Sequence, residues 1–290
     1  MKKKNWILVA LILAFLMIFV VYRQYDAMHT DTEAPQITIE NTQLLLSVQD
    51  EKNVLLQGVT ATDKQDGDVT DRVLIESMEL LDDTGRMEIC YAAVDSSGNV
   101  SKASREVRYT DYVSPRFSLS EPLIYGEYES FDIMSDVFAT DVLDGDIQHR
   151  IHATSLTYES ISNVGCHDVY FQVTNSLGDM SDITIPVEVV KSGTYNADLT
   201  LTDYLIYLSV DDNFKAENYL KTFVYKTEET SLRSGVPENY SLNIGGAVNT
   251  KVPGVYTVEY RVTYTMRSTV NPEYDQEYTG YSKLIVLVEG

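Results

Sequence analysis

The sequence predicts an all-β protein, built as tandem β-sandwich domains that follow one N-terminal transmembrane helix. Three observations lead to this prediction. One unbroken apolar run lies near the N-terminus, the rest of the chain repeats itself at a spacing of about 80 residues, and each repeat alternates apolar and polar residues as strands do. No segment after residue 30 has a convincing long helical period.

The apolar run extends from Trp6 to Tyr22 and follows Lys2-Lys3-Lys4. A helix of this length, at about 1.5 Å per residue, nearly spans the hydrocarbon core of a bilayer. The aromatic residues at its ends favour the two interfaces, and the lysines predict a cytoplasmic N-terminus with the C-terminal domains outside the cell. A cleaved signal peptide is the alternative, but its apolar region is usually shorter, and Tyr25-Asp26-Ala27 is a poor cleavage site. We therefore expect an uncleaved single-pass anchor in the cell membrane.

The charge balance and the motifs exclude several classes of function. The chain has 290 residues, with 22 Lys+Arg against 44 Asp+Glu and a net charge of −22. A surface this acidic repels phosphate backbones, which argues against nucleic-acid binding. The sequence also lacks a glycine-rich phosphate loop, a zinc-ligand spacing and a nucleophile elbow. We therefore expect a protein that is not an enzyme.

Internal repeats define the domain organisation. Asp31-Thr32-Glu33-Ala34-Pro35 recurs as Asp111-Tyr112-Val113-Ser114-Pro115, and Ala61–Val69, which contains Asp-Gly-Asp, recurs as Ala139–Ile147. A third copy keeps the glycine-led strand Gly254–Val262 but has lost Asp-Gly-Asp. Units of this size with several short strands are typical of β-sandwiches. The predicted parts are 1–30 (cytoplasmic tip, anchor and juxtamembrane linker) and three β-sandwich domains, 31–111, 112–191 and the divergent 192–290. The final strands of these domains are predicted near 106–109, 183–190 and 284–288.

The motifs together resemble a known family. The pattern is an Ala-Pro start, then A-x-D-x-x-D-G-D-[VI], then a glycine-led strand, and last D-S-x-G-N-x-S. It is similar to bacterial immunoglobulin-like repeats of the DUF5011 type. Such repeats are found on Gram-positive surface proteins and are related to hyalin-type repeats. The first copy matches through Ala61–Thr70 and Asp95–Ser101, whereas Thr174–Asp179 departs from the last motif in the second copy. The resemblance covers 35–190, and 195–290 more loosely. It implies extracellular Ig-like β-sandwiches and no catalytic activity.

Two groups of aspartates are candidate Ca²⁺ ligands, because Ca²⁺ takes six to eight oxygen ligands and clustered carboxylates in a loop can supply them. Their spacing is not that of an EF-hand. The alternative interpretation is turn chemistry, in which the aspartates cap their own loop and Gly67 and Gly145 take positive φ. The candidates are Asp63, Asp66, Asp68 and Asp71 in the first copy and Asp141, Asp144 and Asp146 in the second.

The third copy is rich in tyrosine and predicts a binding tip. Tyr274, Tyr278 and Tyr281 lie in a polar, hairpin-like stretch after Asn271-Pro272. Exposed tyrosine commonly contacts proteins and sugar rings, so these three are candidates for binding an extracellular glycan or protein. Ordinary strand tyrosines are the alternative, as we expect for the inward-facing Tyr260.

The two cysteines give no catalytic or disulfide signal. Cys166 precedes His167, and neighbours on a strand point to opposite faces, so the pair is a poor nucleophile and base. Cys90 aligns with Tyr170 and not with Cys166, so the two copies share no disulfide position.

The sequence as a whole predicts a membrane-anchored extracellular protein that acts in adhesion, ligand binding or as a surface spacer. One alternative is a structural subunit of a membrane-associated cell-envelope or secretion assembly, in which the repeats would join partner proteins. An enzyme is the other alternative, and no acid, base or nucleophile constellation supports it.

Overall fold

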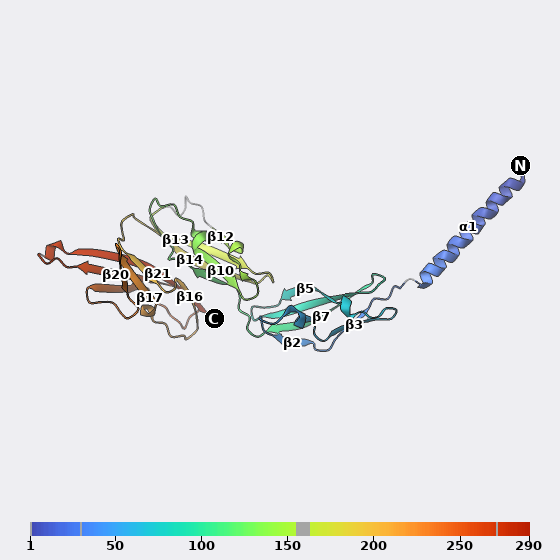
Figure 1. Ribbon diagram of the computed structural model, residues 1–290, viewed down its shortest axis with the longest axis horizontal. Helices are drawn as coiled ribbons and strands as arrows, with labels where there is room; N and C mark the ends of the chain where they lie inside the picture. The colour runs from blue at the N-terminus through green and yellow to red at the C-terminus, as the bar shows by residue number, and fades with distance from the viewer. Residues whose placement is uncertain (1, 30, 155–162, 271) are drawn as a thin grey trace. The chain divides into compact units, whose positions relative to one another are not determined.

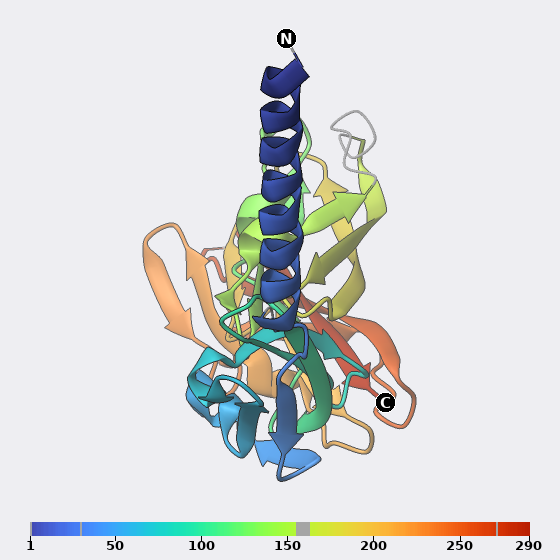
Figure 2. The ribbon, with the colours of Figure 1, turned by 90° about the vertical axis from the view of Figure 1, so that its right-hand side faces the viewer.

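A computed structural model of the protein describes residues 2–29, 31–154, 163–270 and 272–290. The chain forms two compact units, Met1–Tyr112 and Val113–Gly290. One helix, α1 (Lys2–His29), precedes a succession of β-strands and short helical turns (Figures 1 and 2). The all-β prediction is confirmed, as tandem Ig-like β-sandwich domains that follow one N-terminal apolar helix.

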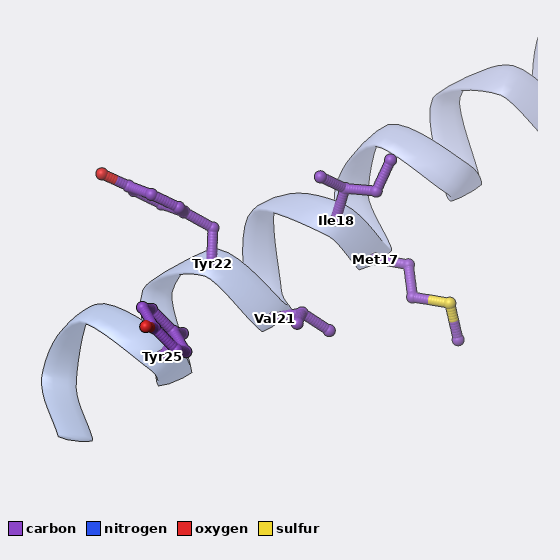
Figure 3. A pocket seen from close by; sticks show the side chains of 5 residues that line it. All are labelled: Met17, Ile18, Val21, Tyr22 and Tyr25. Atoms are coloured by element: carbon purple, nitrogen blue, oxygen red, sulfur yellow. The ribbon is translucent and has the colours of Figure 1, made fainter. Parts of the chain in front are cut away.

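Helix α1 is apolar on all sides. Its segment Leu8–Tyr25 has a mean hydropathy of 2.1 and is not buried by any other part of the protein, so it is long and apolar enough to cross a membrane. Met17, Ile18, Val21, Tyr22 and Tyr25 project outward from its C-terminal turns (Figure 3). The helix continues beyond Tyr22, where the predicted apolar run ends, because the residues that follow are also compatible with helix.

The first domain is a sandwich of a three-stranded and a four-stranded sheet. In the larger sheet, Met87, Ile89 and Tyr91 alternate with exposed or half-buried residues and are fully buried, as the period of two requires. The smaller sheet has β1 (Gln36–Ile39), β3 (Val59–Asp63) and β4 (Gly67–Asp68), and the larger has β2 (Gln43–Leu46), β7 (Val100–Tyr109), β6 (Arg86–Val94) and β5 (Leu74–Leu80), with turns η1 (Lys52–Leu56) and η2 (Thr70–Arg72).

The second domain repeats this arrangement. Phe171, Val173 and Ile185 are among the buried residues of its core. Its smaller sheet has β8 (Arg116–Leu119), β10 (Val137–Asp141) and β11 (Gly145–Asp146), and the larger has β9 (Ile124–Gly126), β14 (Met180–Val190), β13 (Gly165–Thr174) and β12 (His152–Thr154), with α2 (Ile133–Asp136) and η3 (Gln148–Arg150) between strands.

The third domain has the same sheet orders despite its divergent sequence. Where the first two domains have Asp-Gly-Asp, it has a tighter hairpin in which Lys226 takes positive φ. Its sheets are β15 (Asp198–Leu201), β17 (Leu220–Tyr225) and β18 (Glu228–Ser231), and β16 (Leu205–Ser209), β21 (Gln276–Glu289), β20 (Gly254–Met266) and β19 (Tyr240–Gly245), with turns η4 (Ala216–Tyr219) and η5 (Pro272–Tyr274).

One shared feature shows that the three domains are true structural repeats. In each, the second strand pairs in parallel with the last: β2 with β7, β9 with β14 and β16 with β21. All other pairs among the described strands are antiparallel. Each last strand is longer than the sequence predicts, because its polar N-terminal half still pairs with the preceding strand.

The second and third domains pack against each other within the second unit. Leu205 and Ile285 of the third domain are buried in one cluster with Phe117 of the second. The Tyr207 hydroxyl accepts a hydrogen bond from the Phe117 backbone N–H at 2.8 Å, and Arg116 forms an ion pair with Glu289 at 2.6 Å. The Arg116 guanidinium also lies over the Tyr207 ring, 4.6 Å from its centroid. Apolar burial and these polar contacts therefore join the two domains.

The core of the first domain contains a polar network. Arg105 is only 3% exposed and donates hydrogen bonds to the Tyr91 hydroxyl at 2.8 Å, the Gln57 carbonyl at 2.9 Å and the Leu55 carbonyl at 2.6 Å. The Tyr91 hydroxyl donates to the same Leu55 carbonyl at 2.6 Å. These bonds satisfy the carbonyls of η1 where the chain crosses the core.

Candidate functional site

The predicted aspartate motif forms the turn between β3 and β4. Asp63 is the last residue of β3, and its Oδ1 accepts hydrogen bonds from the backbone N–H groups of Gln65 at 2.7 Å and Asp66 at 2.8 Å. Gly67 follows at φ +78°. The corresponding turn of the second domain is built in the same way, since Asp141 Oδ1 accepts from Leu143 and Asp144 N–H, both at 2.9 Å. One oxygen of each leading aspartate therefore serves the turn.

The next aspartate of each motif binds neighbouring side chains. Asp66 accepts from Ser96 N–H at 2.6 Å and pairs with Arg72 at 2.8 Å. These contacts, led by the Ser96 hydroxyl, lower the pKa of Asp66. Asp144 has the equivalent contacts with Ser176 and Arg150, both at 2.7 Å.

The remaining predicted ligands lie away from these carboxylates. Asp68 and Asp146 each cap the short helical turn that follows, through Thr70 N–H at 3.0 Å and Gln148 N–H at 2.9 Å. Asp71 is exposed in η2. Among the described residues, neither the four predicted ligands of the first domain nor the three of the second form a group whose carboxylate oxygens are close enough to share one ion.

A different carboxylate group forms instead at one end of the first domain. Asp31, Asp63 and Asp95 each place one carboxylate oxygen within 4.8 Å of those of the other two. They come from three separate segments: the start of the domain, the end of β3 and the loop after β6. Their exposed fractions are 7%, 8% and 4%, so all three are buried. We call these residues the Asp31–Asp63–Asp95 cluster.

Backbone hydrogen bonds fix the orientation of each carboxylate in this cluster. Asp31 Oδ1 accepts from Glu33 N–H at 3.0 Å. Asp95 Oδ1 accepts from the N–H groups of Ser97 at 2.9 Å and Asn99 at 2.8 Å. Asp63 Oδ1 is held by its turn, but Asp63 Oδ2 is buried and has no hydrogen-bond partner among the described residues. A buried oxygen without a donor is costly, so it indicates a missing partner.

Asn99 connects two members of the cluster. Its Nδ2 donates to Asp95 Oδ2 at 2.7 Å and to the backbone carbonyls of Asp31 at 3.1 Å and Glu33 at 3.2 Å. Burial by itself raises the pKa of Asp95, but the hydrogen bonds from Asn99 and Ser97 outweigh it and leave the pKa lowered. Asp95 is therefore ionised at neutral pH.

The basic side chains nearby are engaged elsewhere. Lys64 pairs with Glu33 at 2.9 Å and Arg72 with Asp66, and none of the ion pairs between described residues includes a member of the cluster. Two unit charges about 5 Å apart repel by about 3 kcal/mol at an effective dielectric constant of about 20. Three buried oxygen donors with this repulsion suit a hard cation.

In the second domain, an amide side chain stands in place of one carboxylate of the cluster. Asn175 occupies the position of Asp95, and its Nδ2 donates to Asp141 Oδ2 at 3.1 Å. Asn175 Oδ1 accepts from Leu177 and Asp179 N–H, both at 3.0 Å, as Asp95 does in the first domain. The loop therefore has the same form in the two domains, but its first position is a carboxylate only in the first domain, and in the second Asp179 stands at the position of Asn99.

Sequence reasoning missed Asp31 and Asp95 as candidate ligands. Both stand in motifs that define the repeats, Asp31–Pro35 and Asp95–Ser101, but they are 64 residues apart in the chain. For Asp95 the distinguishing signal is an exchange of acid and amide between the aligned loops, since Asp95 and Asn99 correspond to Asn175 and Asp179. Only the fold shows that Asp63 lies between them.

The three predicted tyrosines lie in different surroundings. Tyr274 is 67% exposed, in η5. Tyr278 is half-buried and its ring contacts that of Tyr225 at 3.5 Å between centroids. Tyr281 stacks on Tyr195 at 4.7 Å and donates to Glu188 of the second domain at 3.1 Å. Tyr278 and Tyr281 point to opposite faces of β21, so the three do not form one surface. Asn271 lies outside the described residues.

The cysteines are not paired. Cys90 is half-buried and Cys166 is exposed, and both are free thiols. Although the residue is exposed, partial desolvation of its thiol raises the pKa of Cys166, which disfavours the thiolate. His167 binds the Asn163 carbonyl at 2.7 Å through a ring nitrogen.

Comparisons with known sequences relate the chain to parts of larger proteins. No family model matches it. It is 30% identical over 141 residues to an uncharacterized 81.3 kDa protein of Acholeplasma phage L2, which covers 48% of this chain and 18% of that protein. It is 26% identical over 208 residues to the pesticidal crystal protein Cry22Aa of Bacillus thuringiensis, which covers 70% of this chain and 27% of that protein. The chain thus spans less than a third of the length of these curated relatives.

Solved structures give only distant likenesses. Carbohydrate-binding module and INT domains of Clostridium perfringens ZmpB, in complex with GlcNAc, share 18% identity at a TM-score of 0.23, over 57% of this chain and 31% of that one. Mouse cadherin-23 domains EC22–24 share 11% identity at a TM-score of 0.20, over 88% of this chain and 99% of that one. At these TM-scores neither likeness supports a functional conclusion.

Proposed function

We propose that the protein is a membrane-anchored extracellular Ig-like repeat protein that acts, without catalysis, in adhesion or ligand binding at the cell surface. Helix α1 serves as the single-pass anchor, with the basic N-terminus in the cytoplasm and the β-sandwich domains outside. The second and third domains carry the contact surface, and the first domain acts as the spacer next to the membrane.

The observation that carries this proposal is the order of the parts. An apolar helix that nothing in the protein buries is followed directly by three domains of one topology. An apolar surface of this size is unfavourable in water, so it needs an apolar environment. The Asp66, Asp95 and Asp144 carboxylates have lowered pKa values because turn hydrogen bonds and ion pairs engage them, whereas the free Cys166 thiol has a raised pKa, so none of these groups pairs an activated nucleophile with a base.

Membrane attachment can be tested by changing α1 alone. Leu13→Lys together with Phe15→Lys places two charges in the middle of the apolar segment, where each is strongly unfavourable. We expect the wild-type chain in the membrane fraction and the variant to be lost from it. A mature N-terminus near Met28 would show instead that the helix is a cleaved signal peptide.

The contact surface can be tested with the two units as the structure defines them. The full chain in lipid nanodiscs is compared with a chain that ends at Tyr112, the boundary of the first unit. A truncation after Val190 would instead remove Leu205 and Ile285 from the core of the second domain. Capture of cell-wall or host glycans by the full chain alone would support the proposal. Co-purification of both forms with the same membrane proteins of the cell would favour the envelope-assembly alternative.

A further inference from the structure

We propose that the Asp31–Asp63–Asp95 cluster binds one Ca²⁺ ion, and that this ion fastens the first residues of the first domain to the rest of its sandwich. Asp31 begins the domain, Asp63 ends β3 and Asp95 follows β6, so a single ion would connect three segments that are distant in the chain. This site is separate from any ligand-binding surface of the second and third domains.

The geometry of the cluster suits an ion of this size. Ca²⁺ binds oxygen at about 2.3–2.6 Å, so two ligands of one ion are at most about 5 Å apart. The three carboxylate oxygens lie within 4.8 Å of one another, which meets this limit. All three donors are oxygens, and neither His nor Cys belongs to the cluster, which favours a hard cation over zinc or copper.

The unpartnered oxygen of Asp63 is the independent observation that points to a ligand. Asp63 is 8% exposed, its Oδ1 serves the turn, and its Oδ2 is buried without a hydrogen-bond partner among the described residues. In the second domain the same oxygen of Asp141 receives the amide of Asn175. The cation therefore does in the first domain what this amide does in the second: it supplies positive charge to a buried oxygen.

The experiment uses the full chain in detergent micelles, freed of metal with a chelator and titrated with CaCl₂ in a calorimeter. We expect one strong binding event per chain. In Asp63→Asn the amide oxygen can still accept from Gln65 and Asp66, while its NH₂ group supplies a donor in place of the ion. We expect this variant to fold and to bind Ca²⁺ at least tenfold more weakly.

The matched control is Asp68→Asn. This residue lies in the same turn motif but is exposed and only caps Thr70, so we expect unchanged Ca²⁺ affinity. Asp31→Asn is a second variant that leaves the β3–β4 turn intact and should also weaken binding at least tenfold. Equal loss in Asp68→Asn and Asp63→Asn would overturn the assignment of the ligands.

Hydrogen exchange gives a second readout that does not depend on calorimetry. In the wild-type chain, Ca²⁺ should slow exchange in segments 31–35 and 95–99, and the Asp63→Asn variant should show no such change. No binding by the wild-type chain up to about 10 mM Ca²⁺, well above the range of weak extracellular sites, would overturn the proposal. Equal affinity for Mg²⁺ would overturn the choice of ion.

Discussion

The first and second domains have the same strands in the same order, but they satisfy their buried polar groups in different ways. The first domain buries Asp95 beside Asp63, and Arg105 beside Tyr91. The second has Asn175 and Phe171 at the positions of Asp95 and Tyr91, and Ile185 at the position of Arg105. One fold therefore accepts either an apolar residue or a hydrogen-bonded charged residue at the same core position, as Ile185 and Arg105 show.

The largest effect should follow from giving the first domain the apolar residue that the second domain has at the position of Arg105. We expect Arg105→Ile to destabilise that domain by about 3 kcal/mol, because the carbonyls of η1 lose their buried donor. Urea unfolding, followed by hydrogen exchange of peptides from each domain, measures it. The control is Ile185→Val, which should cost the second domain about 1 kcal/mol and leave the first unchanged. A loss below 1 kcal/mol in Arg105→Ile would show that water satisfies these carbonyls.

Giving the second domain the buried aspartate of the first should destabilise it slightly less. Asn175→Asp removes the hydrogen bond to Asp141 and places two carboxylates in contact. We expect a loss of about 2 kcal/mol in the second domain, because the new buried charge has no compensating partner. The same exchange measurement tests it. Unchanged stability would mean that this loop tolerates either residue. That result would contradict the difference drawn between the buried polar groups of the two domains.

A smaller effect should come from the hydroxyl of the buried tyrosine. Tyr91→Phe copies Phe171 and removes two hydrogen bonds: the one to the Leu55 carbonyl, which Arg105 still binds, and the one that Arg105 donates to the Tyr91 hydroxyl. We expect a loss of about 1 kcal/mol. Because the two residues share a partner, the stability losses of Tyr91→Phe and Arg105→Ile should not be additive. A double-mutant cycle on urea midpoints measures this coupling. Strict additivity would contradict the network.

Low pH should destabilise the first domain more than the second. This is the smallest of the four expected effects. The pKa values of Asp66 and Asp95 are lowered in the fold, so the folded state binds their protons less readily than the unfolded state. Their contribution is therefore complete above about pH 4 and is lost as the pH falls through the lowered values. In the second domain, Asp144 titrates in the same way but Asn175 does not. Hydrogen exchange at pH 5, 4 and 3, corrected for intrinsic rates, should show earlier loss of protection in the first domain.

The all-β class, the apolar helix and the repeats can be predicted from the amino-acid sequence, because they follow from patterns along the chain. Alternation of apolar and polar residues fixes which strand residues face the core, as at Met87 and Ile89. Asp63, together with Gly67 of the Asp-Gly-Asp motif, fixes the β3–β4 turn through contacts within a few residues. The third copy has lost this motif, and the structure has a tighter hairpin there.

Which residues share a site depends instead on how distant segments pack in the folded protein. Asp31, Asp63 and Asp95 are brought together by the pairing of β1 with β3 and by the loop that joins β6 to β7, and no local pattern records this proximity. The tyrosines of the third copy show the converse, because Tyr278 and Tyr281 are close in sequence but point to opposite faces of one strand. Local pattern is set by neighbours in the chain, whereas a binding site is set by strand pairing between distant segments.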